Sequence, residues 1–273
     1  MVMINLLDAK TNATADYYND AVIADFYQSL WGGSDIHIGL FATGNETVAE
    51  ASKAMTLHLL ELAGVTAGQK VLDIACGYGG TLRILADMGC FAAGIDISET
   101  CVSIARAANA SAGFDDISVS LGDFHAIDSE PATWDVVICQ EAIIHSADRS
   151  KVFAEAYRVL RSGGAFAFSD ILTAPGADLA KVEAAYARLR ADAGATVHDY
   201  ANMARTAGFV VEYIEQRPYD IATHYEKLAA ALASTYSSDE PLVSSIGSSI
   251  GQWQEATADG QITWACFVAL KPD

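Results

Sequence analysis

The sequence predicts an α/β fold in which a mostly parallel, seven-stranded sheet carries helices on both faces. Three observations lead to this prediction. Short apolar, β-branched runs alternate with helically spaced segments from residue 69 onwards. A glycine-rich turn, Cys76-Gly77-Tyr78-Gly79-Gly80, stands between the first run and the first of these helical segments. Acidic residues close the first three runs: Asp73, Asp96 and Asp123.

The regular alternation extends to residue 172. Strands are predicted over residues 69–75, 90–97, 117–124, 134–142 and 165–172, and helices over residues 81–89, 98–113 and 149–164. In the first helix Leu82, Leu85 and Ala86 share one face, and Gly89 ends the segment. Strict alternation of strand and helix indicates βαβ units with right-handed crossovers, so we expect these strands to be parallel.

Beyond residue 172 strands and helices no longer alternate regularly. Helices are predicted over residues 178–193, 198–207, 224–236 and 240–257, and strands over residues 209–217 and 262–271. Because the last strand follows a long excursion, we expect it to form an antiparallel hairpin at the sheet edge. We divide the chain into an N-terminal lid segment, residues 1–44, and a domain, residues 45–273, with helical insertions at about 173–197 and 220–257.

The charge of the chain excludes some partners. With 35 acidic and 16 basic residues the formal charge is −19, and no basic stripe is present to neutralise phosphates. We therefore expect neither nucleic acid nor an anionic membrane as a partner, but a small molecule bound by a monomer or homodimer. The same acidic balance is typical of proteins from salt-loving or marine sources, where salt screens the repulsion.

Two further features concern the compartment and the thiols. No apolar run approaches the roughly 20 residues that span a bilayer, and the N-terminus lacks the basic region of a secretory signal, so we expect a cytoplasmic protein. The five cysteines form no CxxC or CxH pair. We expect them to be buried thiols without a disulfide, and we expect no metal site.

The glycine-rich turn indicates a ligand site. Glycines between a strand and a helix let the backbone approach a ligand at the carboxyl edge of a parallel sheet, although a tight turn alone also uses them. The pattern G-x-G-G departs from the G-x-G-x-x-G of dinucleotide sites. Asp73 suits a cationic amino group better than a pyrophosphate, and Asp96 can accept ribose hydroxyls in either ligand class.

The third strand distinguishes the two ligand classes. Asp123 can accept the exocyclic amine of adenine while Phe124 flanks the ring. Three acids at the ends of three successive strands fit a ligand that carries an amine, a ribose and an adenine. That ligand is S-adenosylmethionine.

The motifs VLDIACGYGG, GIDIS, GDF, DVVICQEAIIHS, VLRSGG and FSDIL, over roughly residues 65–175, resemble those of class I S-adenosylmethionine-dependent methyltransferases. The resemblance implies their Rossmann-like fold. It also implies that the cofactor is bound by the following residues: Asp73, Ala75, Gly77, Gly79 and Gly80 at the methionine part, Asp96 and Ile97 at the ribose, Gly122, Asp123 and Phe124 at the adenine, and Gln140.

A second resemblance is more specific and covers most of the chain. FYQSLWGGSDIHIGLF, residues 26–41, together with CQEAIIHS, RPYDIATHY and ITWACFVALK, is similar to the sarcosine and dimethylglycine N-methyltransferases, which form glycine betaine, an osmolyte. In that family the N-terminal segment lies over the cofactor. The resemblance therefore implies that Tyr27, Trp31 and His37 lie over the donor methyl group, with Trp31 contacting both cofactor and substrate. Aromatic faces there would stabilise the cationic sulfonium and ammonium groups.

The sequence offers several candidate residues for each contact with the substrate. His145 or His37 can accept a proton from the amine or orient it, and either can also be a hydrogen-bonded structural histidine. Gln140 can contact cofactor or substrate. Candidates for binding the substrate carboxylate are Arg188, Arg190 and Arg217, each of which can equally be a surface charge.

The chain departs from the family pattern at two positions. Family members carry Pro-Met after the aspartate of the fifth strand, where this chain has Asp170-Ile171-Leu172, and Ala75 replaces the first glycine of D-x-G-x-G. The first departure leaves the acceptor open. It allows a methyltransferase for a larger amine or a sugar hydroxyl in a natural-product pathway. The residues are also compatible with two other functions: a non-catalytic S-adenosylmethionine-binding protein and, more distantly, a nicotinamide oxidoreductase.

Overall fold

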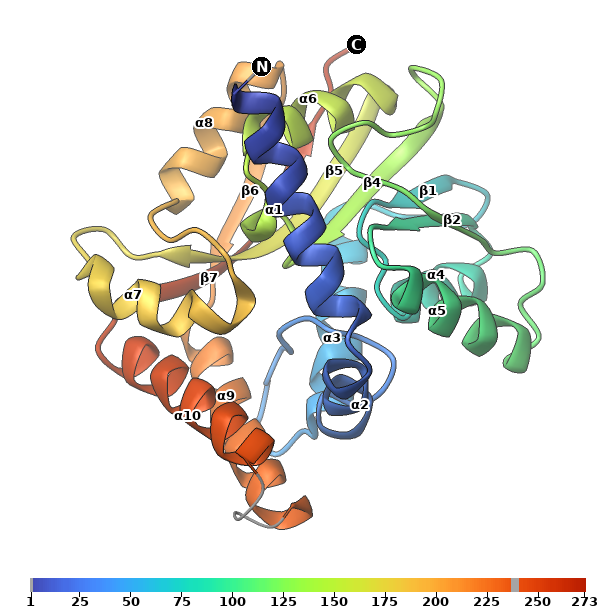
Figure 1. The fold of residues 1–273 in the computed structure, drawn as a ribbon. Helices are drawn as coiled ribbons and strands as arrows, with labels where there is room; N and C mark the ends of the chain where they lie inside the picture. The colour runs from blue at the N-terminus through green and yellow to red at the C-terminus, as the bar shows by residue number, and fades with distance from the viewer. Residues whose placement is uncertain (1, 237–240) are drawn as a thin grey trace.

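The predicted sheet is present, with seven strands in the order β3-β2-β1-β4-β5-β7-β6 (Figure 1). The computed structural model describes residues 2–236 and 241–273. Residues 1 and 237–240, which belong to the predicted lid segment and second insertion, lie outside the described residues. The strands are β1 Lys70–Asp73, β2 Phe91–Asp96, β3 Ser118–Leu121, β4 Trp134–Gln140, β5 Leu160–Thr173, β6 Val210–Gln216 and β7 Ile262–Leu270.

Strands β1 to β5 are parallel, as predicted. Strand β7 is antiparallel and pairs with β6 in a hairpin at the sheet edge, both as predicted. It pairs with β5 along one side and with β6 along the other, so that β6 forms the edge. The burial of β7 from Ile262 to Ala269 agrees with a strand that is paired on both sides.

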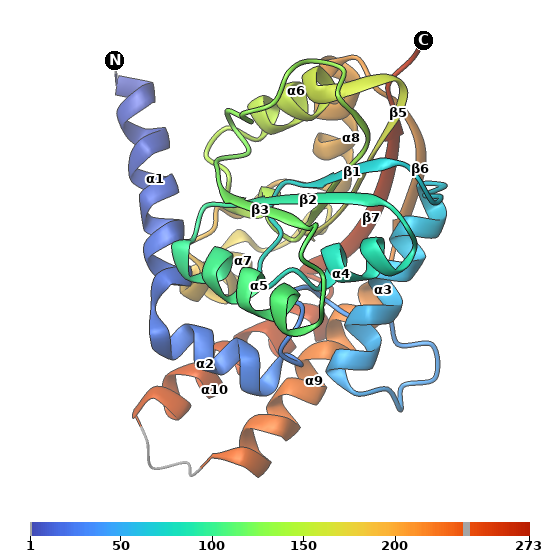
Figure 2. The ribbon, with the colours of Figure 1, turned by 90° about the vertical axis from the view of Figure 1, so that its right-hand side faces the viewer.

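Helices cover both faces of the sheet (Figure 2). On one face α6 (Arg149–Val159) and α8 (Val197–Ala207) enclose an aromatic core that includes Phe153, Phe168 and Tyr200. The other face carries α3 (Val48–Leu62), α4 (Gly80–Asp87) and α5 (Glu99–Ser111). Side-chain caps start several helices: Thr47 begins α3 in a capping box with Glu50, and Ser98 begins α5.

The remaining helices gather at the carboxyl end of the strands. They are α1 (Val2–Asn19), α2 (Ala21–Leu30), α7 (Leu179–Tyr186), α9 (Pro218–Thr235) and α10 (Pro241–Ala258), with short 3-10 turns η1 (Ile143–His145) and η2 (Ala187–Leu189). The sequence pattern assigned no element to α1, α2 or α3. The predicted helix over residues 149–164 ends earlier, at Val159, because Leu160 already pairs with Trp134 in the sheet.

Two sequence-based expectations can be compared directly with the structure. All five cysteines are free thiols, and Cys76, Cys101, Cys139 and Cys266 are buried, whereas Cys90 is partly exposed. Within residues 2–236 and 241–273, no helix is both long and apolar enough to cross a membrane.

A buried carboxyl group joins α8 to the sheet. The Asp170 side chain on β5 is fully buried, and its oxygens accept hydrogen bonds from the Tyr200 hydroxyl at 2.7 Å and the Ile171 N–H at 2.9 Å. Burial raises the pKa of Asp170 to about 7, because the two hydrogen bonds only partly compensate for lost hydration.

This pKa predicts a pH-dependent stability. In the unfolded chain Asp170 ionises near its usual pKa of about 3.9, so the unfolded state loses the proton first as the pH rises. The stabilising contribution of the Asp170 side chain is complete below a pH of about 3.9, where both states keep the proton. It is lost as the pH rises towards about 7, the pKa of Asp170 in the folded state. We expect Asp170→Asn to gain stability relative to the parent chain between pH 4 and about 7, measured by urea unfolding.

The exposed Asp87 at the end of α4 provides the matched control. Asp87→Asn is expected to follow the parent chain at every pH. A difference between Asp170→Asn and the parent chain that stays constant with pH would contradict the assignment.

Candidate active site

A first cavity opens at the carboxyl ends of the parallel strands. It encloses about 880 Å³ of empty space, including space open to solvent. The predicted cofactor residues that line it are Asp73, Ala75, Gly77, Asp96, Ile97, Gly122, Asp123, Phe124 and Gln140. These residues follow four different strands, and only the parallel sheet brings them to one edge.

The floor of the first cavity is acidic and buried. Burial raises the pKa of Asp73 to about 7, and the charges of Asp96 and Asp35 add to the effect. Burial also raises the pKa of Asp96, although its oxygens accept the backbone N–H groups of Gly77 at 2.8 Å and Ser98 at 2.9 Å. A cationic ligand would offset the cost of ionising these groups.

The far end of the cavity is built differently. One oxygen of Asp123 accepts the backbone N–H of His125 at 2.8 Å and lies 2.7 Å from His125 Nδ1. Burial alone would raise the pKa of Asp123, but these contacts with His125 outweigh it and lower the pKa. The other imidazole nitrogen lies 2.7 Å from the Ser146 hydroxyl. Asp123 is therefore a fixed, ionised acceptor beside the Phe124 ring.

Gly79 and Gly80 have roles at the start of α4. Gly79 adopts φ 78° as the N-cap residue and does not line the first cavity. At Gly80 an added Cβ would lie 2.0 Å from Asp35 Oδ1, so the absence of a side chain is what admits the Asp35 carboxylate. The glycine-rich turn therefore accommodates a protein segment as well as a ligand.

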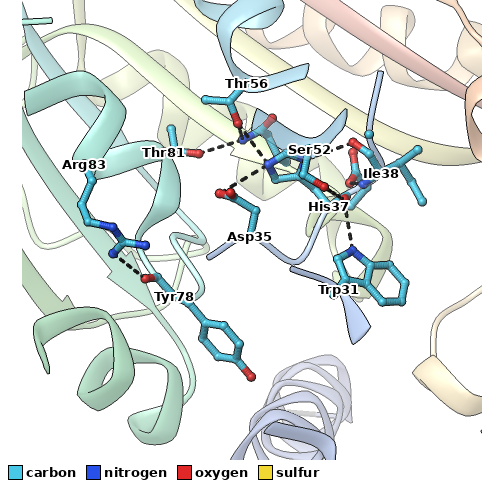
Figure 3. A network of polar contacts seen from close by, with 12 residues as sticks. Trp31, Asp35, His37, Ile38, Ser52, Thr56, Tyr78, Thr81 and Arg83 are labelled. Carbon is cyan, nitrogen blue, oxygen red and sulfur yellow. Dashed lines mark hydrogen bonds and ion pairs between the residues drawn. The ribbon is translucent and has the colours of Figure 1, made fainter. Parts of the chain in front are cut away.

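That segment is residues 31–41, which we call the covering segment. Backbone hydrogen bonds fasten both of its ends: the Gly80 N–H donates to Ser34 O at 3.1 Å, and the Leu40 N–H donates to Ala51 O at 2.9 Å. The Trp31 indole N–H and the Ser52 hydroxyl both donate to His37 O at 3.1 Å (Figure 3). The covering segment is an ordered wall rather than a solvated loop.

Glu141 fastens the centre of the covering segment to the sheet. One carboxylate oxygen accepts the Ile38 N–H at 2.5 Å. The other accepts the Ser169 hydroxyl at 2.5 Å and the Trp264 indole N–H at 2.8 Å. Glu141 itself has φ 49°, a left-handed conformation that non-glycine residues rarely adopt. Burial raises the pKa of its carboxyl group.

His37 lines the first cavity and is tied down at both ring nitrogens. Its Nδ1 lies 3.0 Å from Ile38 O, and its Nε2 lies 3.1 Å from the Thr56 hydroxyl and 3.6 Å from Asp35 Oδ1. Burial alone would lower its pKa, but Asp35 and Glu141 outweigh this and raise the pKa to about 9. A protonated imidazole with these partners holds the covering segment in place and is not available as a base.

A second, smaller cavity adjoins the first and encloses about 360 Å³ of empty space, including space open to solvent. Tyr27 and Trp31 line this cavity and not the first, so the structure does not bring the Trp31 ring to the predicted cofactor residues. Its remaining walls include Tyr225, Ile171 and Arg188. Four residues line both cavities and mark their junction: Tyr18, Ile36, Glu141 and His145.

Arg188 contributes a guanidinium group to the wall of the second cavity. Its Nε donates to the Ser249 hydroxyl at 3.0 Å, and its Nη1 donates to the Tyr17 hydroxyl. The guanidinium carbon lies 5.9 Å from the centre of the Tyr17 ring and 5.4 Å from that of Phe26. These contacts hold a cation in a mostly aromatic cavity, where it can meet an anionic group.

His145 stands at the junction of the two cavities. Its Nε2 lies 3.1 Å from the Tyr18 hydroxyl, and its buried Nδ1 has no hydrogen-bond partner in the described part of the chain. Burial lowers the pKa of His145 to about 4, with the charges of Lys10, Arg149 and Arg188 adding to the effect. The imidazole is therefore neutral near pH 7.

Two predicted arginines lie elsewhere. Arg190 is exposed and lines neither cavity. Arg217 also lines neither cavity, because its guanidinium pairs with Glu215 at 2.7 Å and with Asp220 at 2.5 Å. Asp220 in turn accepts the Phe41 N–H at 2.6 Å. Arg217 therefore supports the covering segment from behind.

Sequence reasoning missed Glu141, Tyr18, Asp35 and Tyr225. Glu141 had a usable signal, because it directly follows Gln140 at the carboxyl end of β4. Asp35 and Tyr225 also had a signal, because they lie in the segments FYQSLWGGSDIHIGLF and RPYDIATHY that carry the second resemblance. Tyr18, on α1, had none.

Comparisons with known proteins agree with this geometry. A family model for a methyltransferase domain matches residues 65–226. The chain is 30% identical to the sarcosine/dimethylglycine N-methyltransferase of Aphanothece halophytica, over 97% of this chain and 99% of that protein. It is 31% identical to the dimethylglycine N-methyltransferase of Parasynechococcus marenigrum, over 97% of each.

A solved structure extends the match to three dimensions. It is that of a candidate sarcosine dimethylglycine methyltransferase from Galdieria sulphuraria, with a TM-score of 0.84 and 30% identity. The match covers 92% of this chain and 98% of that chain.

The contacts of Glu141 predict a graded response to substitution. Glu141→Ala leaves three donors unpaired, at roughly 1–3 kcal/mol for each one that water cannot reach. Glu141→Gln can keep the oxygen that faces Ser169 and Trp264, but it turns an amide NH₂ towards the Ile38 N–H. We expect Glu141→Gln to lose hydrogen-exchange protection mainly in residues 31–41, and Glu141→Ala to be less stable overall.

Glu61→Gln, at an exposed position on α3, is the matched control and should match the parent chain in unfolding and exchange. Unchanged protection of the Ile38 amide in Glu141→Gln would show that the covering segment does not depend on this carboxylate.

Proposed function

The chain belongs to the methyltransferase-domain family, and from that premise we propose that it methylates the amine of a small amino acid, using S-adenosylmethionine. The substrate is sarcosine, dimethylglycine or both, and the products are dimethylglycine and glycine betaine, an osmolyte. One observation carries the proposal. A small second cavity with a guanidinium and aromatic walls adjoins the acidic cavity at the strand ends.

The residues of the first cavity fit the cofactor. When bound, S-adenosylmethionine supplies an electrophilic methyl group on a sulfonium. Asp73 would hold its amino group, Asp96 its ribose hydroxyls, and Asp123 with Phe124 its adenine. The buried Gln140 Oε1 accepts no hydrogen bond within the described residues, although the Gln140 amide N–H donates to Thr81 at 3.0 Å. A ligand donor at this position would satisfy the carbonyl oxygen.

The second cavity suits a zwitterionic amino acid. Arg188 would bind the substrate carboxylate, and its contacts with Tyr17 and Ser249 fix its position before the substrate arrives. Tyr27, Trp31 and Tyr225 would surround the methylated nitrogen with aromatic faces, which favour quaternary ammonium groups. Glu141 at the junction adds a negative charge on the side nearest the first cavity.

The attacking nitrogen must be free of its proton. The amine would bind in its deprotonated form, with its proton released to solvent. His145 is neutral and lies beside Tyr18, so for sarcosine the pair can accept a hydrogen bond from the one remaining N–H and hold the lone pair towards the first cavity. Dimethylglycine has no N–H in this form, and the cavity walls alone would orient it. His37, protonated and bound to Asp35 and Thr56, has a positioning role on the covering segment. Exclusion of water and alignment of the two reactants are then the main sources of rate.

The proposal also assigns roles to the segments of the chain and names the compartment, the oligomeric state and the partners. Residues 1–44 act as a lid, the domain spans residues 45–273, and the insertions at about 173–197 and 220–257 form the substrate side. Tyr18, Tyr27 and Trp31 of that lid line the second cavity. We infer action in the cytoplasm as a monomer or homodimer, without nucleic acid or membrane partners.

The size of the second cavity favours this acceptor over larger ones. At about 360 Å³ of empty space it is the smaller of the two cavities, against about 880 Å³ for the first, and this difference suits a small acceptor beside a large cofactor. A protein that binds the cofactor without turnover has no use for a guanidinium next to the acidic cavity.

Mass spectrometry of methyl transfer tests the proposal. The purified chain is incubated with S-adenosylmethionine and glycine, sarcosine or dimethylglycine, at low and high salt. We expect methylation of sarcosine, dimethylglycine or both. Cofactor binding without transfer to any of the three amines would refute the substrate assignment while leaving the cofactor assignment intact.

Arg188 predicts a separable effect on the substrate. Loss of a buried hydrogen bond to a charged group costs about 1.5–3 kcal/mol, which is roughly a 10- to 100-fold change in an equilibrium constant. We expect Arg188→Ala to raise KM for the amino acid by about that factor while the cofactor Kd stays unchanged.

Arg190→Ala, at the exposed neighbouring arginine, should leave both constants unchanged. As a second measure, the parent chain should reject the amide of the amino acid, which lacks the carboxylate, and Arg188→Ala should reject it less. Equal discrimination by both chains would remove Arg188 from the substrate site.

A further inference from the structure

Three potential metal ligands of different chemistry meet behind the covering segment. They are His58 on α3, Glu215 on β6 and Cys266 on β7, and their ligand atoms all lie within 4.8 Å of one another. His58 Nε2 lies 2.9 Å from Glu215 Oε2, and Cys266 Sγ lies 3.7 Å from the same oxygen. The cluster lines neither of the two cavities.

The spacing of these atoms is close to that of a tetrahedral zinc site. Zinc binds nitrogen and oxygen at about 2.0–2.2 Å and sulfur at about 2.3 Å, which places neighbouring ligand atoms roughly 3.3–3.6 Å apart. The separations of 2.9 and 3.7 Å need adjustments of a few tenths of an ångström. The third pair of ligand atoms, on His58 and Cys266, lies within 4.8 Å.

The surroundings favour a cation that keeps one open position. The Cys266 residue is fully buried in β7, whereas the His58 and Glu215 side chains are 25% and 27% exposed. Water can therefore reach a metal from one side and complete its coordination. Imidazole, thiolate and carboxylate together are typical ligands of Zn²⁺ among biological divalent cations.

The second carboxylate oxygen of Glu215 connects the cluster to the active site. It pairs with Arg217, which pairs with Asp220, and Asp220 accepts the Phe41 N–H of the covering segment. Helix α3 makes a second connection, since Ser52 and Thr56 on it bind His37. A ligand that joins α3 to β6 and β7 would therefore stiffen the support behind the covering segment.

From this arrangement we propose that His58, Glu215 and Cys266 bind one Zn²⁺ ion, with water as the fourth ligand, in a site separate from methyl transfer. Binding displaces the proton of the Cys266 thiol to solvent, while His58 coordinates through the lone pair of Nε2. The site has a structural role: it links the helix that holds His37 to the two outer strands of the sheet.

The test uses the full chain, freed of metal by dialysis against a chelator. Zn²⁺ is titrated in competition with a chromophoric chelator, and Co²⁺ is titrated separately while the near-ultraviolet thiolate-to-cobalt absorption is recorded. We expect one equivalent of Zn²⁺ per chain, a thiolate band with Co²⁺, and a higher Tm in the presence of Zn²⁺. None of these readings depends on methyl transfer.

Substitutions separate the site from adventitious binding. His58→Gln keeps a donor for Glu215 but cannot serve as an imidazole ligand, and Cys266→Ser and Cys266→Ala remove the thiolate. Each should weaken Zn²⁺ binding by roughly 10- to 100-fold or more, and both Cys266 variants should lose the cobalt band. The matched controls are His198→Gln, at an exposed histidine, and Cys90→Ser, at a partly exposed thiol.

Either of two results would overturn the proposal. One is a parent chain that takes up no Zn²⁺ against the chelator. The other is binding that the His58 and Cys266 variants leave unchanged, which would identify an adventitious ion only.

Discussion

The hydrogen bonds of a single carboxylate, Glu141, hold together the parts of the chain that form the active site. Its oxygens accept donors from the covering segment at Ile38, from β5 at Ser169 and from β7 at Trp264. The left-handed backbone of Glu141 costs of order 1–3 kcal/mol, which the three hydrogen bonds offset. Without this junction the two cavities would lose their common wall.

The electrostatics of the site follow from that junction. Buried acids line the first cavity at Asp73 and Asp96, Glu141 stands between the cavities, and Arg188 lies in the second. Folding without a ligand leaves the acids partly uncompensated, which is why burial raises the pKa values of Asp73 and Asp96. A cationic cofactor and a zwitterionic substrate would supply charges that compensate these groups. Ligand binding would then recover part of the free energy that folding loses by burying the acids.

The covering segment is supported from two sides. The carboxylate of Glu141 and the glycine-rich turn hold its inner face, where Asp35 packs on Gly80. Behind it, Asp220 holds the Phe41 N–H and connects through Arg217 to Glu215. Arg217 lines neither cavity and is connected to the covering segment through Asp220. The cluster of His58, Glu215 and Cys266 lies at the outer end of this second support.

The parallel sheet and the residues at its carboxyl edge could be predicted from the sequence. Periodicity reports which faces are buried, and βαβ connections bring consecutive strand ends together, so Asp73, Asp96 and Asp123 could be predicted to meet. Resemblance also identified the covering segment as part of the site, but not which cavity Trp31 lines. The packing of the fold was needed to place β7 between β5 and β6, to pair Arg217 with Glu215, and to bring Tyr18 to His145 and His58 to Cys266. These contacts join residues on separate elements, and no local pattern records how helices pack across a sheet.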